Sequence, residues 1–100
     1  MYLETLFNLK DKVVAVTGAG GHLCGEMVKS YARAGCKVAI LDLRIEKAKK
    51  TEKEINDEGF DQTLALEMDV SKKSEFEKSL DHIITKFGAL DIFINGAGIN

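Results

Sequence analysis

Four short runs of apolar residues, each followed by a longer polar or amphipathic stretch, constrain the fold of this chain more than any other feature. Hydrophobicity within each run is continuous rather than alternating, which is typical of strands covered on both faces, as in parallel sheets. The runs are Val13-Val14-Ala15-Val16, Val38-Ala39-Ile40-Leu41, Thr63-Leu64-Ala65-Leu66 and Ile92-Phe93-Ile94. We expect a strand at each of them.

Between the runs, apolar residues recur at the spacing of a helix that buries one face. The three stripes are Leu23, Met27, Tyr31 and Ala34; Ile45, Ala48, Thr51 and Ile55; and Phe76, Leu80, Ile83 and Phe87. Met27 and the phenylalanines are expected in the core, and Ser71 and Ser74 are candidate N-caps of the third helix. Each helix is followed by a glycine that suits a left-handed C′ position, namely Gly35, Gly59 or Gly88.

The resulting order β-α-β-α-β-α-β predicts an α/β fold with right-handed crossovers. It is the order of the first half of a Rossmann-type doubly wound parallel sheet, whose strands would lie in the order 3-2-1-4. The sequence contains no linker, no low-complexity tract and no repeat beyond this alternation. A chain of 100 residues can bury roughly two-thirds of its unfolded surface, enough for one core.

Composition and charge exclude several classes of partner. The formal net charge of −2 argues against a nucleic-acid or anionic-membrane surface, which would need a basic excess. The apolar runs are far shorter than the roughly 20 residues of a membrane span, and Met1 to Lys10 lack the features of a secretory signal. We therefore expect neither a nucleic-acid partner nor a membrane partner.

The two cysteines lie at opposite ends of the first predicted helix. That helix would hold Cys24 and Cys36 on the order of 15 Å apart, whereas bridged cysteines need Cα atoms within about 7 Å. We expect free thiols and a reducing, cytoplasmic setting. Cys24 is either a reactive thiol near a helix N-terminus or a small packing residue, and packing is favoured. His82 is expected on the surface, and the Cys and His residues lack metal-ligand spacing.

A glycine-rich segment, Thr17-Gly18-Ala19-Gly20-Gly21-His22-Leu23-Cys24-Gly25, joins the first strand to the first helix. Glycines there let the backbone approach a phosphate, while the helix N-terminus supplies free N–H groups and the positive end of its dipole. The segment predicts a pyrophosphate site that includes Gly18, Gly20, Gly21, His22 and Leu23. A tight turn with incidental glycines is the alternative, because the usual third glycine of the dinucleotide fingerprint is absent.

Asp42 closes the second predicted strand, beside the glycine-rich segment in a parallel sheet. A carboxylate there can accept both ribose hydroxyls of an adenosine and would repel a 2′-phosphate. The next residue, Leu43, offers no positive charge to such a phosphate, although Arg44 could swing toward it. A simple turn residue is the alternative interpretation. Together with the glycines, Asp42 favours NAD over NADP as the cofactor.

Three motifs in the expected order resemble the short-chain dehydrogenase/reductase family, from about Leu9 to Asn100. They are Thr17 to Gly25, Asp69-Val70 and Asn95-Gly96-Ala97-Gly98; the family's first loop reads T-G-x-x-x-G-x-G and its fourth strand ends in N-N-A-G. The resemblance implies an NAD(H)-dependent oxidoreductase that transfers hydride between nicotinamide and an alcohol or carbonyl of a small-molecule substrate. It also implies a homo-oligomer.

The resemblance assigns roles only to residues that match. Gly18 corresponds to the first loop glycine and Asp42 to the ribose-selecting carboxylate. Asp69 and Val70 resemble the pair that meets the adenine ring. The residues that match the fourth-strand motif along the cofactor are Asn95, Ala97 and Gly98.

Three positions depart from the family pattern. His22 and Cys24 stand where the second and third glycines belong, and Gly96 replaces the second asparagine. The form G-G-H-L-C-G followed by N-G-A-G resembles most a branch associated with sugar-acid oxidation, such as mannonate oxidoreductase-like proteins.

The family's catalytic serine and Tyr-x-x-x-Lys pair lie beyond the fourth strand. Tyr2 is followed four residues later by Leu6, and Tyr31 by Gly35, so neither tyrosine has the lysine. We expect residues 1–100 to be the N-terminal part of a dinucleotide-binding domain, with the catalytic half absent and no turnover by themselves. The last predicted strand would then form an apolar edge, and the chain is expected either to self-associate through it or to be only marginally stable as a monomer.

Two other functions stay open at this point. One is a nucleotide-binding module without catalysis. The other is an S-adenosylmethionine methyltransferase-like domain, which also combines a glycine loop with an acidic residue after the second strand. Such enzymes usually carry an acidic residue where Thr17 stands, and Asn95-Gly96-Ala97-Gly98 has no role in them.

Overall fold

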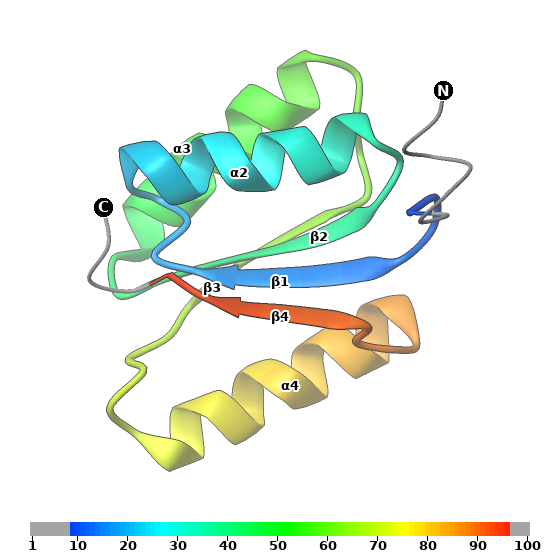
Figure 1. Ribbon diagram of the computed structural model, residues 1–100. Helices are drawn as coiled ribbons and strands as arrows, with labels where there is room; N and C mark the ends of the chain where they lie inside the picture. The colour runs from blue at the N-terminus through cyan, green and yellow to red at the C-terminus, as the bar shows by residue number, and fades with distance from the viewer. Residues whose placement is uncertain (1–8, 97–100) are drawn as a thin grey trace.

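The computed structural model describes residues 9–96, which form a four-stranded sheet with helices on both faces (Figure 1). In chain order the elements are β1 (Val13–Thr17), α2 (His22–Arg33), β2 (Lys37–Asp42), α3 (Ile45–Asp57), β3 (Thr63–Glu67), α4 (Lys73–Phe87) and β4 (Ile92–Asn95). The alternation of strand and helix predicted from the sequence is therefore confirmed. Over this described range, no helix is long and apolar enough to cross a membrane.

All strand pairs are parallel, and the strand order is β3-β2-β1-β4. Val14 of β1 lies between Val38 of β2 and Ile92 of β4. The chain thus moves from β1 to β2 on one side and returns through α4 to place β4 on the other side. The carboxyl ends of β1 and β4 form the point at which the strand order reverses, which is where ligands bind in open α/β sheets.

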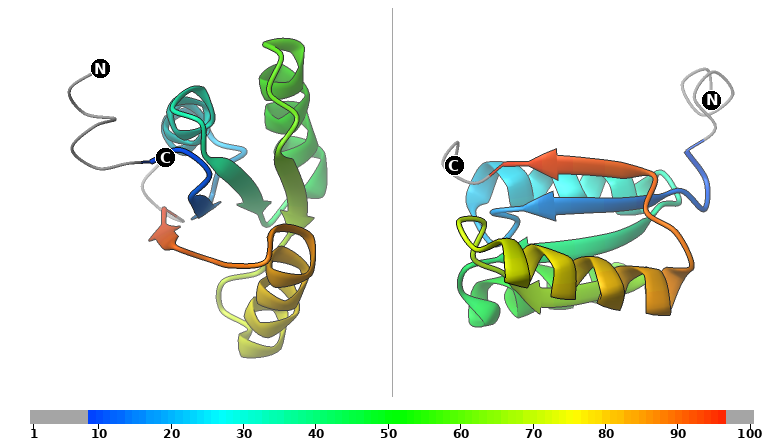
Figure 2. Two further views of the ribbon diagram at one scale, coloured as in Figure 1. Left: turned by 90° about the vertical axis from the view of Figure 1, so that its right-hand side faces the viewer. Right: turned by 90° about the horizontal axis from the view of Figure 1, so that it is seen from below.

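Helices α2 and α3 cover one face of the sheet, and α4 covers the opposite face (Figure 2). Because side chains alternate along a strand, β1 and β2 supply both layers of the core. The layer under α2 and α3 contains Val14, Val16, Cys24, Val28, Val38, Ile40, Ala48 and Ile55, among others. The layer against α4 contains Val13, Ala15, Ala39, Leu41, Met68 and Ile83.

The expectation from the continuous apolar runs, that all four strands are covered on both faces, is confirmed for β1 and β2 and wrong for β3 and β4. Every residue of β1 is buried, as are the four inner residues of β2. The outer strands differ, because β3 is only partly buried and β4 alternates between half-buried and exposed residues. The central pair therefore forms the rigid base of the carboxyl edge.

The stripe predicted for α2 is wrong by one residue. Leu23 is 50% exposed, and Met27 and Tyr31 are only half-buried. The residues that face the sheet are Cys24, Gly25, Val28 and Ala32. The physical reason is that α2 packs close to the strands. Only small side chains fit between the helix and the sheet, and the larger ones lie at the sides of this contact. Phe76 and Phe93, also expected in the core, are 38% and 39% exposed.

The predicted serine caps of the third helix are also wrong. The N-cap of α4 is Lys72, and its side chain makes no capping hydrogen bond. Ser71 instead donates through its backbone N–H and its hydroxyl to Asp69 Oδ1, at 2.9 and 2.6 Å. The hydrogen bonds of Ser71 are thus made within the turn before α4, and its hydroxyl does not cap the helix. The predicted glycine endings are confirmed, and Gly88 has the left-handed φ of 84° that such an ending needs.

Candidate cofactor-binding site

The glycine-rich segment forms a tight turn between β1 and α2 that two neighbouring elements hold in place. Gly18 adopts a φ of 68°, which explains the glycine at this position. Ala19 is buried, and its N–H donates to Leu41 O of β2 at 3.0 Å. The hydroxyl of Thr51, buried on α3, donates to Ala19 O at 3.1 Å. The turn is thus fixed before any ligand is bound.

The helix that follows this turn begins with an open N-terminus. Gly21 is the N-cap of α2, so no side chain caps the helix, and its first turn carries no acidic residue. Such an end offers backbone N–H donors and the positive end of a helix dipole to an anion. Together with the fixed glycine turn, it has the chemistry that a bound pyrophosphate requires.

Asp42, the last residue of β2, binds the glycine-rich segment directly. Its Oδ2 accepts the N–H of Gly20 at 2.9 Å, and its Oδ1 accepts the N–H of Arg44 at 2.9 Å. Each carboxylate oxygen can accept a further hydrogen bond, because an ionised carboxylate has about four acceptor positions. The group is therefore oriented by two backbone donors and can still receive ribose hydroxyls.

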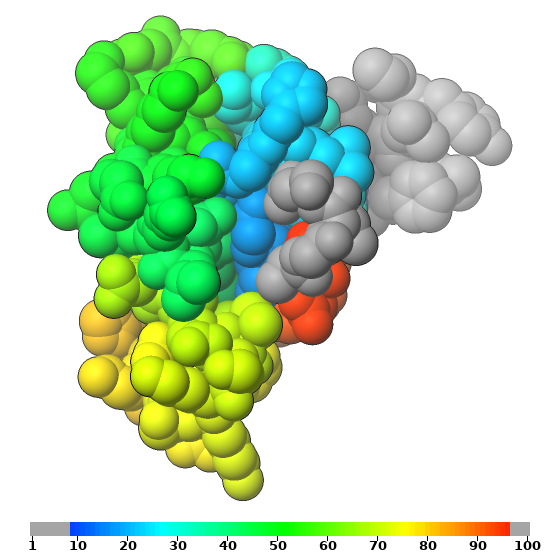
Figure 3. All heavy atoms as spheres, turned by 90° about the vertical axis from the view of Figure 1, so that its left-hand side faces the viewer, coloured from blue at the N-terminus to red at the C-terminus, as the bar shows by residue number. Residues whose placement is uncertain are grey.

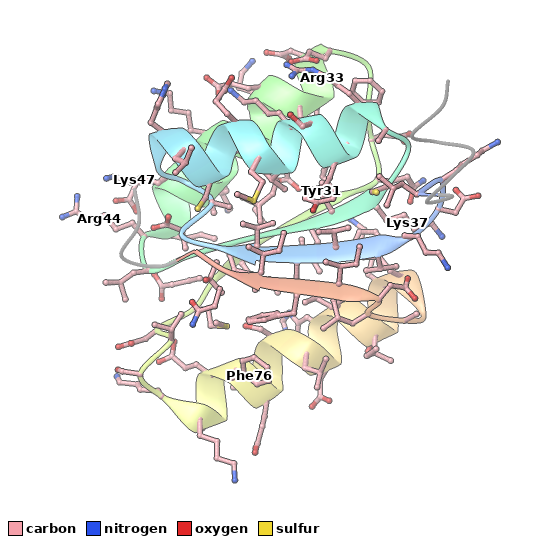
Figure 4. All side chains as sticks on the ribbon, in the orientation of Figure 1. Tyr31, Arg33, Lys37, Arg44, Lys47 and Phe76 are labelled. Carbon is pink, nitrogen blue, oxygen red and sulfur yellow. The ribbon has the colours of Figure 1, made fainter. Side chains whose placement is uncertain are left out.

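Gly20 is required by space rather than by its backbone conformation. A Cβ at this position would lie 2.5 Å from Lys47 Cβ and 2.8 Å from Asp42 Oδ2. A larger residue would push Asp42 and α3 away from the turn. The side chains of Arg44 and Lys47 extend outward at this edge (Figure 4).

A second hydrogen-bond network joins β1 to β4 at the same edge. The hydroxyl of Thr17 donates to Asn95 Oδ1 at 2.8 Å and accepts the N–H of Gly96 at 2.9 Å. Thr17 and Gly96 are both buried. The network fixes the carboxyl end of β4 against that of β1. The glycine turn and the end of β4 are therefore both held in place by hydrogen bonds.

Asp69 and Val70 follow β3 on the far side of β2. Hydrogen bonds from the hydroxyl and the N–H of Ser71 lower the pKa of Asp69. The N–H of Asp69 donates to Glu75 Oε1 at 2.9 Å. Val70 is 47% exposed and Leu43, after β2, is 63% exposed, so two apolar side chains on neighbouring strand ends are open to a ligand.

The predicted site residues lie along one edge of the sheet, although they come from four separate segments. Figure 3 looks onto this edge and shows the blue atoms of β1 and its turn between the green atoms after β2 and the red atoms of β4. The predicted residues in the described range are Gly18, Gly20, Gly21, His22, Leu23, Asp42, Asp69, Val70 and Asn95. Ala97 and Gly98 lie outside the described residues. The His22 side chain is exposed rather than folded into the turn.

The sequence analysis missed three residues that build the site. Thr17 was part of the motif but received no role, and its contact with Asn95 joins residues that are 78 positions apart. Thr51 was taken as one member of an apolar stripe, although a hydroxyl in such a stripe is a signal for a buried hydrogen bond. Leu43 was judged only for its lack of charge.

The larger cavities lie beside this edge. One of about 280 Å³ lies between α2 and α3, and Gly20, Gly21 and His22 contribute to its lining. Another, of about 370 Å³, is lined by residues of β3 and α4 and includes neither the glycine turn nor Asp42. In residues 9–96, no cluster of His, Cys, Asp or Glu is arranged to hold a metal ion.

Comparison with known families decides among the interpretations of this edge. The family model of the short chain dehydrogenases matches residues 12–100. The chain belongs to the short-chain dehydrogenase family. The resemblance inferred from the motifs is thereby confirmed, and the methyltransferase alternative is removed.

Curated relatives of this short-chain dehydrogenase chain are oxidoreductases. An uncharacterised oxidoreductase of Haemophilus influenzae is 41% identical over 100 residues, which cover 100% of this chain and 35% of the relative. A diacetyl reductase of Staphylococcus epidermidis, which forms (S)-acetoin, is 35% identical over 90 residues, 90% of this chain and 35% of the relative. The chain thus spans about a third of the length of these relatives.

Two solved structures extend the similarity to the fold and to a bound cofactor. A proposed D-mannonate oxidoreductase from Haemophilus influenzae, with bound NAD, superposes with a TM-score of 0.86 at 38% identity, covering 96% of this chain and 34% of the other. The 3-ketoacyl-(acyl-carrier-protein) reductase from Brucella melitensis, complexed with NADH, gives 0.78 at 34% identity, covering 85% and 33%. The short-chain dehydrogenase sheet with order 3-2-1-4 is therefore shown.

Proposed function

We propose that this chain is the NAD(H)-binding part of an oxidoreductase that transfers hydride between nicotinamide and an alcohol or carbonyl group of a small molecule. The observation that carries the proposal is the Asp42 carboxylate, which the N–H groups of Gly20 and Arg44 hold beside the open N-terminus of α2. A ribose acceptor and a pyrophosphate donor set are thus adjacent on one rigid edge.

Each part of the edge has a separate task in this proposal. The N–H groups at the start of α2 would bind the pyrophosphate, and the glycine turn would let it approach the backbone. Asp42 would accept the adenosine ribose hydroxyls, and Leu43 and Val70 would contact the adenine from both sides. Asn95, with Ala97 and Gly98, would line the path toward the reacting end. The nicotinamide supplies the hydride chemistry when it is bound.

We propose NAD rather than NADP as the cofactor. A 2′-phosphate on the adenosine ribose would lie beside the Asp42 carboxylate, and the two negative charges would repel each other. Arg44 opposes this preference, but its side chain extends outward from the edge (Figure 4) while its N–H stays bound to Asp42. The bound NAD and NADH of the two structural neighbours support the choice.

The substrate class is a second level of the proposal. A sugar acid is supported by the motif form G-G-H-L-C-G with N-G-A-G and by the proposed D-mannonate activity of one structural neighbour. We propose that a serine and a Tyr-x-x-x-Lys pair elsewhere in the protein handle this substrate. Residues 1–100 would accordingly bind cofactor without turnover, and cofactor reduction by the purified 100-residue chain would contradict this division.

The decisive experiment is a comparison of NAD(H) and NADP(H) affinity in the full-length protein at one salt concentration. We expect tighter binding of NAD(H). Asp42→Ala should weaken NAD(H) binding by about 10- to 100-fold, because hydrogen bonds to a charged group contribute about 1.5–3 kcal/mol. The same variant should lose discrimination against NADP(H).

Asp61→Ala serves as the matched control. Asp61 is an exposed carboxylate between α3 and β3, away from the carboxyl edge, and its removal should leave both affinities unchanged. Equal or tighter binding of NADP(H) by the unaltered protein would contradict the NAD assignment. Absence of binding by either cofactor would leave the non-catalytic module, with another ligand, as the remaining function.

The proposal also includes a cytoplasmic homo-oligomer. Cys24 and Cys36 are free and buried, which supports a reducing compartment. The exposed apolar residues of β4 and α4, among them Phe93 and Ile84, support association. Sedimentation of the full-length protein tests the oligomer, and a monomer at all concentrations would contradict it.

A further inference from the structure

Two of the three departures from the family pattern lie against each other in the structure, although 72 residues separate them. Cys24 is the third residue of α2, and Gly96 follows the last residue of β4. Both are buried, and the Cys24 thiol donates to Gly96 O at 3.6 Å. The contact joins the helix that would bind the pyrophosphate to the strand end along which the rest of the dinucleotide would lie.

The room at Gly96 is taken by the sulfur of Cys24. A Cβ at position 96 would overlap Cys24 Sγ and would lie 2.9 Å from Thr17 O, inside the contact distance of about 3.5–4.0 Å. By contrast, it would lie 3.5 Å from Cys24 Cβ, which is an ordinary contact. The sulfur atom alone therefore makes the severe conflict on the helix side.

Backbone conformation does not account for the glycine. The described glycines with positive φ are Gly18, Gly35, Gly59 and Gly88, so Gly96 has a backbone that other residues adopt. The family pattern has a glycine at position 24 and a side chain at position 96, whereas this chain has the reverse. In this chain, the side chain that fills the space beside position 96 comes from the helix.

We propose that Cys24 and Gly96 are a matched pair of positioning residues that sets the spacing between the N-terminus of α2 and the carboxyl end of β4. The pair fixes the backbone of Gly96 from the helix side, while Thr17 Oγ1 fixes it from β1 by accepting its N–H at 2.9 Å. Its consequence for cofactor affinity rests on the proposed function, since this spacing is then the width of the dinucleotide site.

A double-mutant cycle in the full-length protein tests the pair. Gly96→Ala adds the conflicting methyl group, and Cys24→Ala removes the sulfur while it keeps a good helix former. We expect Gly96→Ala alone to lower the melting temperature by about 4 °C or more and to weaken NAD(H) binding about tenfold. Adding Cys24→Ala should restore a measurable part of both losses, since it removes the overlap with the sulfur, while the 2.9 Å approach to the backbone oxygen of Thr17 remains.

The matched control is Val28→Ala in place of Cys24→Ala. Val28 is buried on the same face of α2, one turn further on, but it is not among the atoms nearest to a Cβ at position 96. Its removal should add to the effect of Gly96→Ala rather than relieve it. Additive effects of Cys24→Ala and Gly96→Ala, like those of the control, would overturn the proposal.

AMP separates a positioning role from a general loss of stability. AMP would contact Asp42 and Val70 on the β2 and β3 side of the edge, whereas NAD⁺ would also cross the end of β4. Gly96→Ala should therefore weaken AMP binding by less than about threefold while NAD⁺ loses about tenfold. Equal losses for both ligands would overturn the positioning role. If the unaltered protein bound neither ligand, the proposed function would fail, and the melting temperatures would still decide whether the two residues form a pair.

Discussion

The two faces of the sheet are built from alternate residues of the same strands, yet helices cover them to different extents. On one face, two helices cover a layer with Val14, Val38 and Ile40 at its centre, each completely buried. On the other face, α4 alone covers a layer with Ala15 and Ala39 at its centre. There, Phe93 of β4 remains 39% exposed.

The exposed side of the α4 face is apolar. Phe93 packs edge-on against Phe76 of α4, with ring centroids 5.3 Å apart, and Phe76 is itself 38% exposed. Within residues 9–96, β4 pairs with β1 only. The difference teaches that the α2–α3 face is the more fully covered layer, whereas the α4 face is suited to contact further protein.

The largest expected difference between the faces is in their contribution to stability. In the 100-residue chain, Ile40→Ala should lower the free energy of unfolding by about 2–5 kcal/mol, since it leaves a cavity in a fully covered layer. Phe93→Ala, on the α4 face, should cost only about 1–2 kcal/mol, because its side chain is partly exposed already. Urea denaturation of both variants measures the contrast, and equal losses would show that the faces are equally complete.

The exposed apolar side chains of the α4 face should lead to self-association. We expect the 100-residue chain to associate through β4, because an apolar edge strand offers unpaired backbone groups to another chain. Phe93→Lys should reduce this association, while Leu43→Lys, at an exposed apolar residue on the carboxyl edge, should not. Light scattering across a concentration series measures it; a monodisperse monomer with a high melting temperature at every concentration would contradict the interpretation of this face.

The thiols of the covered face should be protected from alkylation. Burial, with a smaller contribution from the charge of Asp91, raises the pKa of Cys36 above its usual 9.0. A raised pKa in the folded state means that the unfolded chain loses this proton first, so the stability present at neutral pH falls as the pH rises past the unfolded value toward the folded value. Cys36→Ala should make the melting temperature less sensitive to alkaline pH. Rapid alkylation of the folded chain by iodoacetamide would show that α2 does not seal this face.

The smallest expected effect belongs to the ion pairs that join α2 to α3. Arg33 donates two hydrogen bonds to the Glu58 carboxylate at 2.9 and 2.8 Å, which lowers the pKa of Glu58. A lowered pKa means that the pair contributes stability above the usual carboxyl range, and that this is lost as the pH falls through the folded value.

Arg33→Gln should therefore lower the melting temperature slightly at neutral pH and hardly at all in acid, and salt should reduce the difference. Lys73→Gln is the control on α4, where Lys73 lies 4.0 Å from Glu77 of the same helix. A pH-independent effect of Arg33→Gln would show that the guanidinium acts through packing rather than charge.

The local features of the chain were predictable because they arise from neighbouring residues. Continuous apolar runs located all four strands, and Gly88 marked a helix end by its need for a left-handed conformation. The glycine-rich segment and Asp42 were located for the same reason, since each sits where one element must turn into the next. These signals depend on period and turn chemistry, which a short stretch of sequence contains in full.

The corrections concern packing between elements and a competing hydrogen bond within a turn. The orientation of α2 depends on how closely it approaches the sheet, which favoured Cys24 over Leu23 as the buried residue. The hydroxyl of Ser71 donates to Asp69 and does not form the expected helix cap. In both cases, the spacing along the chain permitted two arrangements, and packing or a competing hydrogen bond selected one.

The sequence by itself therefore determined the order of the elements, the α/β class and the family of this protein, because these depend on local periodicity and on short motifs. Only the tertiary structure decided why Gly20 must be a glycine, how Thr17 holds Asn95, and that Cys24 occupies the space beside Gly96. The partners in each of these contacts are brought together by the parallel pairing of β1 with its two neighbours. Steric fit and hydrogen-bond geometry across such distances have no counterpart in the linear spacing of residues.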